Sequence, residues 1–393
     1  MMAAVAVQML ERRARAVTGR REASRLAALR HLDLTLVAAA LALAAIGVVM
    51  VYSATNAIYG GYYLKHQLIY AVLGIVVMVV LMSFDYRRLE EWAVFIYGFS
   101  VLTLLAVRAV GHTSNLGATR EIVLGPLAIQ PSEFGVLSVI VASAVFLHRH
   151  DTELGVANLA RLGGLVAVPM ALVAAEPDLG TTIVTAVVVA TMLVVGGVRL
   201  RYLALVVLGL VSLVLIGTKV HLLHSYQLQR LTAFLHQSDC NQPKFAGTQA
   251  CYQPLFAQTA IGAGGVSGTG LFHGALTNSN YIPEDWTDMI FSTIGEQFGF
   301  VGSVVVVGLF GVIALRMVRA MQVARDTLGR LLCGGALAFV AFSVFQNVGM
   351  NAGLMPITGI PLPFISYGGS ALFATFAVVG LVANVEMRRF RSR

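Results

Sequence analysis

Long runs without a charged residue recur along the chain and determine its predicted architecture. Six of them contain no Asp, Glu, Lys or Arg: 34–64, 92–107, 179–198, 202–218, 297–315 and 331–385. Because a bilayer core about 30 Å thick needs about 20 apolar residues per helix, these runs have membrane-spanning lengths. The last run is long enough for two helices, and we expect the break at 356–363, where three prolines disfavour a continuous helix.

Three further apolar stretches, 66–84, 134–147 and 162–175, bring the prediction to ten helices. The basic residues test that number, since cytoplasmic loops carry the excess of Lys and Arg. With a cytoplasmic N-terminus, ten helices place 21 of the 27 basic residues inside, whereas omitting 162–175 leaves 14 inside and 13 outside. The sequence therefore predicts an all-α polytopic integral membrane protein with ten transmembrane helices and both termini cytoplasmic.

One connection is much longer than the others. It is the predicted extracytoplasmic loop 221–286, between the seventh and eighth helices, inside a membrane domain that spans 32–387. A basic cytoplasmic segment, 1–31, precedes this domain, and a short basic tail, 388–393, follows it. Cys240 and Cys251 lie in the loop, where the compartment is oxidising, so they either form a disulfide or stay as two free thiols.

Composition agrees with a membrane protein and locates its charge. Hydrophobic residues make up 58% of the chain and charged residues 12%, about half the share in a water-soluble domain. This excludes a soluble enzyme and a nucleic-acid binder. The net charge of +8 divides into +11 inside and −3 outside when residues are assigned to the two sides of the membrane. The basicity therefore belongs to the cytoplasmic face, and it does not indicate an acidic substrate.

Two acidic residues stand out among those on the outer side. We expect the eighth helix to include Thr287, which would put Asp288 and Glu296 on one face, with Glu296 about 12 Å deeper. Ionisable groups at membrane depth usually mark a functional cavity. Asp288 could instead complement the helix dipole, and Glu296 could be a structural ion pair or a protonated hydrogen bonder. No cofactor motif is evident, because the glycine-rich run 262–270 lacks the ending of a P-loop.

Several motifs together resemble one family. They include Gln130-Pro131-Ser132-Glu133, Glu176-Pro177-Asp178, Thr287-Asp288, Gly295-Glu296-Gln297-Phe298-Gly299 and Thr358-Gly359-Ile360-Pro361-Leu362-Pro363-Phe364. In these residues the chain resembles the SEDS family of bacterial cell-wall polymerases, to which RodA and FtsW belong. The wording of 358–364 is more similar to the RodA branch.

The resemblance implies an inverting glycosyltransferase that polymerises lipid II for cell elongation and shape. It implies work at the outer face of the bacterial cytoplasmic membrane, on an undecaprenyl-linked glycan, with a class B penicillin-binding protein (a transpeptidase) as partner. In that family the acid that matches Asp288 is the proposed catalytic residue. A carboxylate there can act as general base on the 4-hydroxyl of the incoming sugar.

The same resemblance points to substrate-binding residues. The departing pyrophosphate needs positive charge, either from a divalent cation such as Mg or Mn or from Arg120, Arg230 and Lys244. We also count Glu133 and Glu296 among the substrate-binding residues.

The chain departs from the family pattern at several positions, and other functions stay open. It has Glu121 where the family usually has Trp, Val136 where many members have Lys, Glu176 where Gln is more frequent, and Trp286 where His is usual. The alternatives are a lipid II flippase or lipid carrier, a division-specific polymerase similar to FtsW, and a scaffold for the partner. Ten helices with buried acids and broken segments also describe transporters.

Overall fold

The computed structural model of the chain describes most of the predicted membrane domain. The described residues are 31–110, 112–113, 119–124, 127–150, 155–176, 178–199, 201–204, 230, 232–235, 249–279, 281–282 and 285–390. The longer helices are α2 (Leu34–Tyr59), α3 (Tyr62–Ser83), α4 (Leu89–Val110), α5 (Pro131–Arg149), α6 (Val156–Ala175), α7 (Leu179–Val195), α10 (Gln249–Gly264), α12 (Ile290–Val323), α13 (Thr327–Asn351) and α14 (Gly369–Met387). The shorter elements are η1 (Tyr86–Arg88), α11 (Ala275–Asn278), β1 (His112–Thr113), β2 (Thr119–Leu124) and β3 (Leu127–Ile129).

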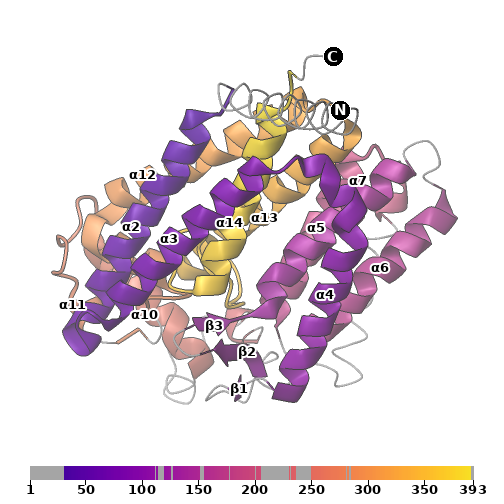
Figure 1. The fold of residues 1–393 in the computed structure, drawn as a ribbon. Coiled ribbons are helices and arrows are strands. Elements are labelled where there is room, and N and C mark those ends of the chain that lie inside the picture. Colours follow the sequence, from indigo (N-terminus) through magenta and orange to yellow (C-terminus); the bar gives the residue numbers. More distant parts are fainter. Residues whose placement is uncertain are drawn as a thin grey trace, which may run out of the picture.

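The long helices form two groups, and their axes are roughly aligned (Figure 1). One group contains α2, α3, α12, α13 and α14, and the other contains α4, α5, α6 and α7. Helix α13 joins the groups, since it packs against α12 and α14 as well as against α5 and α7. Residues far apart in sequence therefore meet beside α13.

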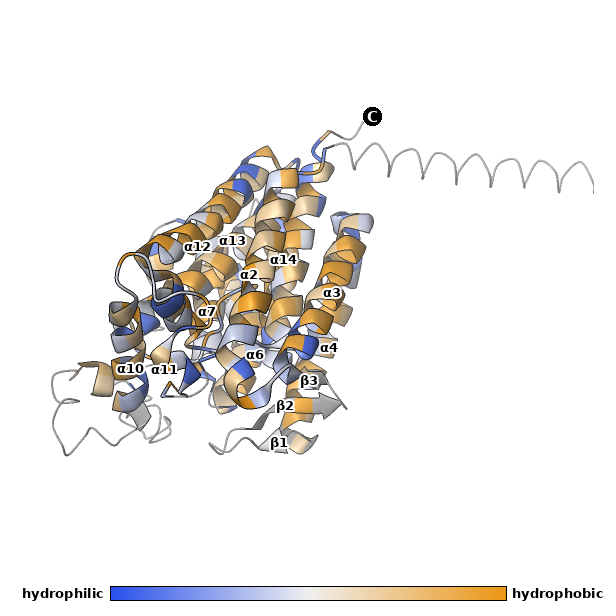
Figure 2. Ribbon diagram, turned by 90° about the vertical axis from the view of Figure 1, so that its left-hand side faces the viewer, coloured by the Kyte–Doolittle hydropathy of each residue, from blue (hydrophilic) through white to orange (hydrophobic). Residues whose placement is uncertain are grey.

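Eight helices of the described residues are long and apolar enough to cross a membrane, and α7 is a shorter apolar helix. Apolar residues cover the helices along their length, and hydrophilic residues gather toward the ends (Figure 2). The stretch 162–175, whose omission would have removed the bias of basic residues, lies in α6, a helix of 20 residues. Of the ten predicted segments only 202–218 falls largely outside the described residues, so the number ten stays a prediction.

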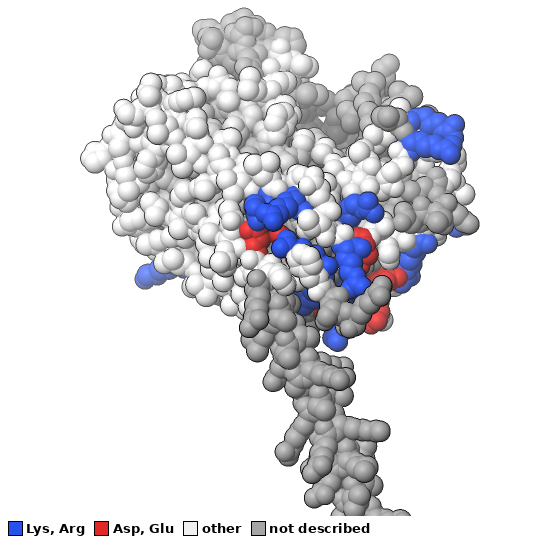
Figure 3. Space-filling view, turned by 90° about the horizontal axis from the view of Figure 1, so that it is seen from above, with Lys and Arg blue, Asp and Glu red and all other residues white. Residues whose placement is uncertain are grey.

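The orientation follows from the ends of the helices. Helix α2 begins and α14 ends at the upper end of Figure 1, where the rings of His31 and Phe390 are 5.1 Å apart, and α10, α11 and the strands lie at the lower end. Lys and Arg side chains gather on the upper face (Figure 3). Under the positive-inside rule we expect that face to be cytoplasmic, and we call the lower end the outer end.

The prediction of a purely helical chain was wrong at one connection. Between α4 and α5 the chain forms a three-stranded antiparallel sheet in the order β1-β2-β3. Strands β2 and β3 pair through Ile122 with Ile129 and Leu124 with Leu127. The signal was a β-branched run beside Gly125-Pro126, a turn dipeptide between two apolar segments. The sheet sits at the outer ends of α4 and α5 (Figure 1).

The predicted break near the C-terminus is confirmed, and the predicted start of the eighth helix is wrong. Helix α13 ends at Asn351 and α14 begins at Gly369, with irregular backbone across 356–363. Helix α12 begins at Ile290 rather than at Thr287, so Asp288 lies in a turn before the helix. Asp288 and Glu296 therefore do not share a helical face. The irregular segment 352–368 packs against the turn that carries Asp288.

Candidate active site

The turn that precedes α12 is held by the segment between α13 and α14. The backbone N–H of Tyr367 donates to the carbonyl oxygen of Trp286 over 2.8 Å, and Ser366 Oγ donates to that of Thr287 over 2.6 Å. Ser366 Oγ in turn accepts from the N–H of Leu362 over 2.7 Å. Two stretches of irregular backbone thus satisfy each other's polar groups, as non-helical backbone inside a membrane protein must.

Two asparagines of α13 hold the next carbonyl of the turn. Asn347 Nδ2 donates to the carbonyl oxygen of Asp288 over 2.9 Å and to that of Ile360 over 2.8 Å. Asn351 Nδ2 donates to the Asp288 carbonyl over 3.1 Å, and its Oδ1 accepts from the N–H of Ser292 over 3.2 Å. Both asparagines are fully buried. The backbone of Asp288 is therefore positioned by a rigid helix, and its side chain projects from a fixed point.

The carboxylate of Asp288 and the guanidinium of Arg230 border the same residue, Gly359. A Cβ placed on Gly359 would lie 3.3 Å from Asp288 Oδ2 and 4.0 Å from Arg230 Nη1. Arg230 also donates to the carbonyl oxygen of Ile357 over 3.4 Å. Gly359 has a φ of +75°, a backbone conformation that residues other than glycine rarely adopt, and it lies next to the acid and the cation. The structure thus brings two of the predicted site residues together from positions far apart in sequence.

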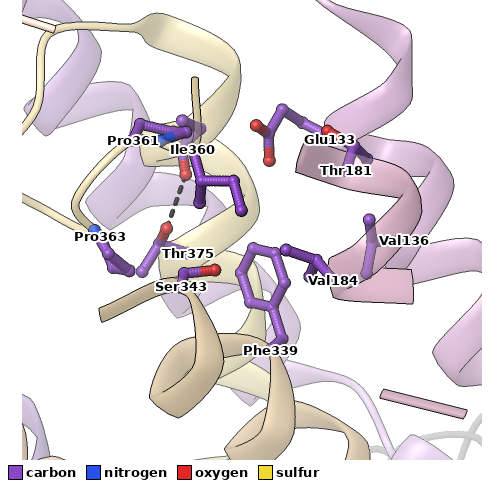
Figure 4. Close-up of a pocket in the computed structure, with 11 residues that line it drawn as sticks. Glu133, Val136, Thr181, Val184, Phe339, Ser343, Ile360, Pro361, Pro363 and Thr375 are labelled. Carbon is purple, nitrogen blue, oxygen red and sulfur yellow. Dashed lines mark hydrogen bonds between the residues drawn. The ribbon is translucent and has the colours of Figure 1, made fainter. Parts of the chain in front are cut away.

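Glu133 lies nearby, in the first turn of α5. Its carboxylate points into a small cavity between α5, α7 and the residues around Ile360 and Pro361 (Figure 4). The cavity has a volume of about 20 Å³, which is room for about one water molecule. Val136, at the position where many family members have Lys, lines the same cavity.

Asp178 fastens the start of α5 to the start of α7. Its carboxylate caps α7 by accepting from the N–H of Thr181 over 3.0 Å, and it accepts from Ser132 Oγ over 3.2 Å. Glu133 shares its cavity with Thr181, which is hydrogen-bonded to Asp178, and with Ile360, which follows the glycine beside Asp288. Three acids from three elements therefore converge on the outer side of the bundle, with Arg230 beside one of them.

Glu296 lies in a different environment from Asp288. Its carboxylate is 1% exposed and accepts from the N–H of Leu276 over 2.8 Å, and from the N–H and Oγ1 of Thr277 over 3.0 and 2.5 Å. It thus caps α11, the short helix of the outer loop. This is a structural arrangement, but Glu296 takes part in it as an acceptor of three hydrogen bonds and not as the ion pair or protonated hydrogen bonder that the sequence left open. Whether Glu296 also contacts substrate stays a prediction.

The glycine-rich run docks onto a break in α12. Gly299 has φ +64° and ψ −159°, so the helical hydrogen bonding stops there. The N–H groups of Thr269 and Gly270 donate to the carbonyls of Glu296 and Gln297, each over 3.0 Å, and Gly265 accepts from Phe300 over 2.9 Å. A Cβ on Gly268 would lie 2.2 Å from the Gln297 oxygen. The run therefore satisfies the backbone of a kinked helix and is not a phosphate cradle.

Asp285 is the first residue of the turn that carries Asp288, and it is 1% exposed. Burial, together with the nearby charge of Glu296, raises the pKa of the Asp285 carboxyl well above its usual value. Because the folded state then binds this proton more tightly than the unfolded state, Asp285 costs stability as the pH rises from the ordinary carboxyl pKa toward the raised one.

Comparison with known proteins identifies the family. The family model for FtsW, RodA and SpoVE, described as a cell cycle protein, matches residues 33–390. The chain belongs to this family. It is 33% identical to the peptidoglycan glycosyltransferase MrdB of Escherichia coli K12 over 359 residues, which cover 91% of the chain and 94% of that protein. It is 35% identical to the probable peptidoglycan glycosyltransferase FtsW of Geobacter metallireducens over 367 residues, covering 91% and 95%.

Solved structures of the FtsW/RodA/SpoVE family have the same fold. One, from work on the coordination of polymerization and crosslinking by a peptidoglycan synthase complex, matches with a TM-score of 0.76 and 31% identity, covering 92% of this chain and 99% of that chain. RodA of Thermus thermophilus matches with a TM-score of 0.69 and 29% identity, covering 92% and 98%. The apolar helices and these relatives make the chain a multi-pass membrane protein of the family.

The predicted site residues separate into three sets: those that lie together, one that lies apart, and those whose side chains are not described. Asp288 and Arg230 lie together, with Glu133 close by, whereas Glu296 faces α11. Arg120 belongs to β2, and its side chain is not described. Lys244 and Cys240 lie outside the described residues, so their predicted roles, including the disulfide with the buried Cys251, stay predictions.

Sequence reasoning missed the residues that position Asp288. Asn347, Asn351 and Ser366 lie in the uncharged run 331–385, which was interpreted only as two spans. A signal was present, because asparagines at i and i+4 in an apolar helix share one face and need buried partners. Their partner, the backbone of a turn about 60 residues earlier, could not be found by spacing alone.

Proposed function

We propose that this chain is an inverting peptidoglycan glycosyltransferase that polymerises lipid II at the outer face of the bacterial cytoplasmic membrane, with Asp288 as general base. The observation that carries the proposal is the carboxylate of Asp288, in the turn before α12, beside the guanidinium of Arg230. Relatives named peptidoglycan glycosyltransferases, matched over about nine-tenths of the chain, support the enzyme class.

The proposed reaction joins two lipid-linked sugars. The 4-hydroxyl of the terminal sugar of an incoming lipid II attacks the anomeric carbon of the lipid-linked glycan from the face opposite the leaving group. The new C–O bond forms as the bond to the pyrophosphate oxygen breaks, which inverts the anomeric centre. Asp288 takes the hydroxyl proton, and the pyrophosphate takes the electron pair of the broken bond. A positioned base contributes roughly 10²- to 10⁴-fold to such a step.

The leaving pyrophosphate needs compensation for its growing charge. Arg230 is a described cation beside this step, since it borders the same glycine as Asp288. A planar guanidinium suits a phosphate because it presents several N–H donors in one plane. Arg120 and Lys244 on the outer side, or a Mg or Mn ion that arrives with the pyrophosphate, are further proposed sources of positive charge.

An apolar cavity supplies a place for the polyprenyl tail. It has a volume of about 590 Å³ and opens between α3 and α14 on one side and α4 and α5 on the other. Its lining runs from Leu81 and Leu89 near the cytoplasmic side to Ile129, Pro131 and Phe134 near Glu133. A tail in this cavity would stay at membrane depth while its pyrophosphate reached the outer acids and Arg230.

We further propose that the chain works with a class B penicillin-binding protein. The support is the solved relative from a peptidoglycan synthase complex that couples polymerization to crosslinking. Relatives named MrdB and FtsW match at similar identity, so overall identity does not separate the two branches. The proposed elongation role therefore rests on the RodA-like sequence of 358–364.

The test is polymer formation by the purified protein. We expect the full chain, reconstituted with its penicillin-binding partner and supplied with fluorescent lipid II, to produce glycan strands that lysozyme digests. In parallel, lipid II placed in the inner leaflet of vesicles should not reach the outer leaflet faster with the protein than without it. Transport without polymer would favour a flippase, and neither activity would favour a scaffold.

A variant of Asn347 tests the positioning of Asp288. Asn347→Ala removes a donor to the Asp288 carbonyl and leaves the donor of Asn351 in place. We expect kcat for polymerisation to fall about 10-fold or more, because small displacements of a catalytic group are costly, while KM for lipid II changes little. Steady-state kinetics at several lipid II concentrations measure both. A rise in KM with unchanged kcat would contradict a positioning role.

A further inference from the structure

An aromatic cluster lies at the outer ends of α2 and α3. It consists of Tyr59, Tyr62, Tyr63, Trp286 and Tyr367, each of which has its ring in contact with at least one other ring of the cluster. The ring centroid of Trp286 is 5.6 Å from that of Tyr59 and 5.4 Å from that of Tyr63, and Tyr63 is 5.3 Å from Tyr62 and 4.9 Å from Tyr367. The cluster is therefore one continuous surface.

The cluster is joined to the turn that carries Asp288. Trp286 precedes Asp288 by two residues, and the N–H of Tyr367 donates to the Trp286 carbonyl. Trp286 is thus part of the same turn as the proposed base, and Tyr367 is hydrogen-bonded to that turn. A sugar that contacts Trp286 is therefore bound beside the turn that carries Asp288.

The outer part of the aromatic cluster is open, and the cluster rests on a buried ring outside it. Tyr62 is 59% exposed and Tyr59 is 44% exposed, whereas Tyr70, which is not a member of the cluster but packs against Tyr367, is 3% exposed. Aromatic residues of a membrane-interface belt also sit at this depth, one by one among lipid headgroups. Here Tyr59 packs edge to face on Trp286 and Tyr63 packs against it in a tilted arrangement, contacts that a belt does not require.

The chemistry of these rings suits a sugar chain. A pyranose presents a flat face of C–H groups, which is attracted to the negative face of an aromatic ring by dispersion and by the ring quadrupole. Successive rings along a surface can hold successive sugars without reading one particular substituent. The headgroup sugars of a polyprenyl-linked glycan lie at the membrane surface, and the α2–α3 connection joins the ends of two helices that are long and apolar enough to cross the membrane.

We propose that the aromatic cluster is a glycan-binding subsite that holds the sugars of the growing strand next to Asp288. This inference rests on the proposed function and names a binding surface for its substrate. Tyr59 and Tyr62 supply the exposed faces, and Trp286 links the subsite to the catalytic turn. The subsite keeps the strand bound between successive additions, so its loss shortens the product.

Trp286 offers a direct reporter of binding, because the chain has only two tryptophans, Trp92 and Trp286. In the full chain with Trp92→Phe, held in lipid nanodiscs, a lipid-free tetrasaccharide of alternating GlcNAc and MurNAc is titrated while Trp286 emission is recorded. We expect a saturable change in emission. Tyr62→Ala should raise the Kd on the order of tenfold, and Tyr62→Phe, which keeps the ring, should leave it within about twofold.

The matched control is Tyr281→Ala in the same background. Tyr281 is 49% exposed and stacks on Phe256 in the outer loop, outside the aromatic cluster. We expect it to bind the tetrasaccharide as the parent does, and thermal unfolding checks that every variant is folded. No saturable change in the parent, or equal Kd values for parent, Tyr59→Ala and Tyr62→Ala, would overturn the subsite.

Product length gives a second readout that requires turnover. Tyr62→Ala should make shorter strands from lipid II than the parent, and strands of unchanged length would count against the subsite. The two proposals fail separately. Tetrasaccharide binding without polymer would overturn the proposed function alone, and polymer without tetrasaccharide binding would overturn the subsite alone.

Discussion

Asp288→Asn is expected to lower glycan polymerisation by about 10²- to 10⁴-fold, because the amide keeps the shape of the side chain and cannot accept the proton. The backbone of Asp288 is held by Asn347 and Asn351, so the substitution should leave the turn in place. Polymer formation from fluorescent lipid II by the reconstituted protein measures the loss. Thermal unfolding of the variant should match that of the parent.

Two companion variants separate a base from a structural acid. Asp288→Glu restores a carboxylate one methylene farther from the backbone, and we expect it to recover part of the activity. Glu91→Gln makes the same chemical change at an exposed carboxylate at the cytoplasmic end of α4, and it should leave polymerisation unchanged. If the Asp288→Asn variant polymerises lipid II at a rate within a few-fold of the parent rate, Asp288 is not the general base.

Glu296→Ala is expected to destabilise the outer loop strongly. The substitution leaves three donors of Leu276 and Thr277 without their acceptor, and each unsatisfied buried group costs about 1–3 kcal/mol. We expect a large fall in the thermal unfolding temperature. Glu296→Gln should lie between the parent and Glu296→Ala, because its single carbonyl oxygen can replace only part of the carboxylate.

Kinetics decide between the structural and the substrate-binding roles of Glu296. At temperatures where Glu296→Gln is folded, a structural role predicts an unchanged KM for lipid II. In a double-mutant cycle with Thr277→Val, the loss of the Thr277 hydroxyl should matter less once Glu296 is Gln. A raised KM with unchanged thermal stability would instead support substrate binding.

Local features of the sequence predicted much of the fold. The prolines at 356–363 marked the gap between α13 and α14, and the bias of basic residues supported the helix that became α6. These predictions succeed because hydropathy, charge and proline affect the structure of the segment in which they occur. The sheet between α4 and α5 was missed, since a short β-branched run beside a charged segment was weaker than the helical signals around it.

The sequence by itself determined that the chain is a multi-pass membrane protein, and it predicted which face is cytoplasmic and that Asp288 is the acid to examine. Only the tertiary structure decided what surrounds that acid. It brought Arg230 and Gly359 to Asp288, turned Glu296 toward α11, and used the glycine-rich run to satisfy the break at Gly299. The physical reason is that buried polar groups must find partners, and these partners come from segments whose separation in sequence carries no periodic signal.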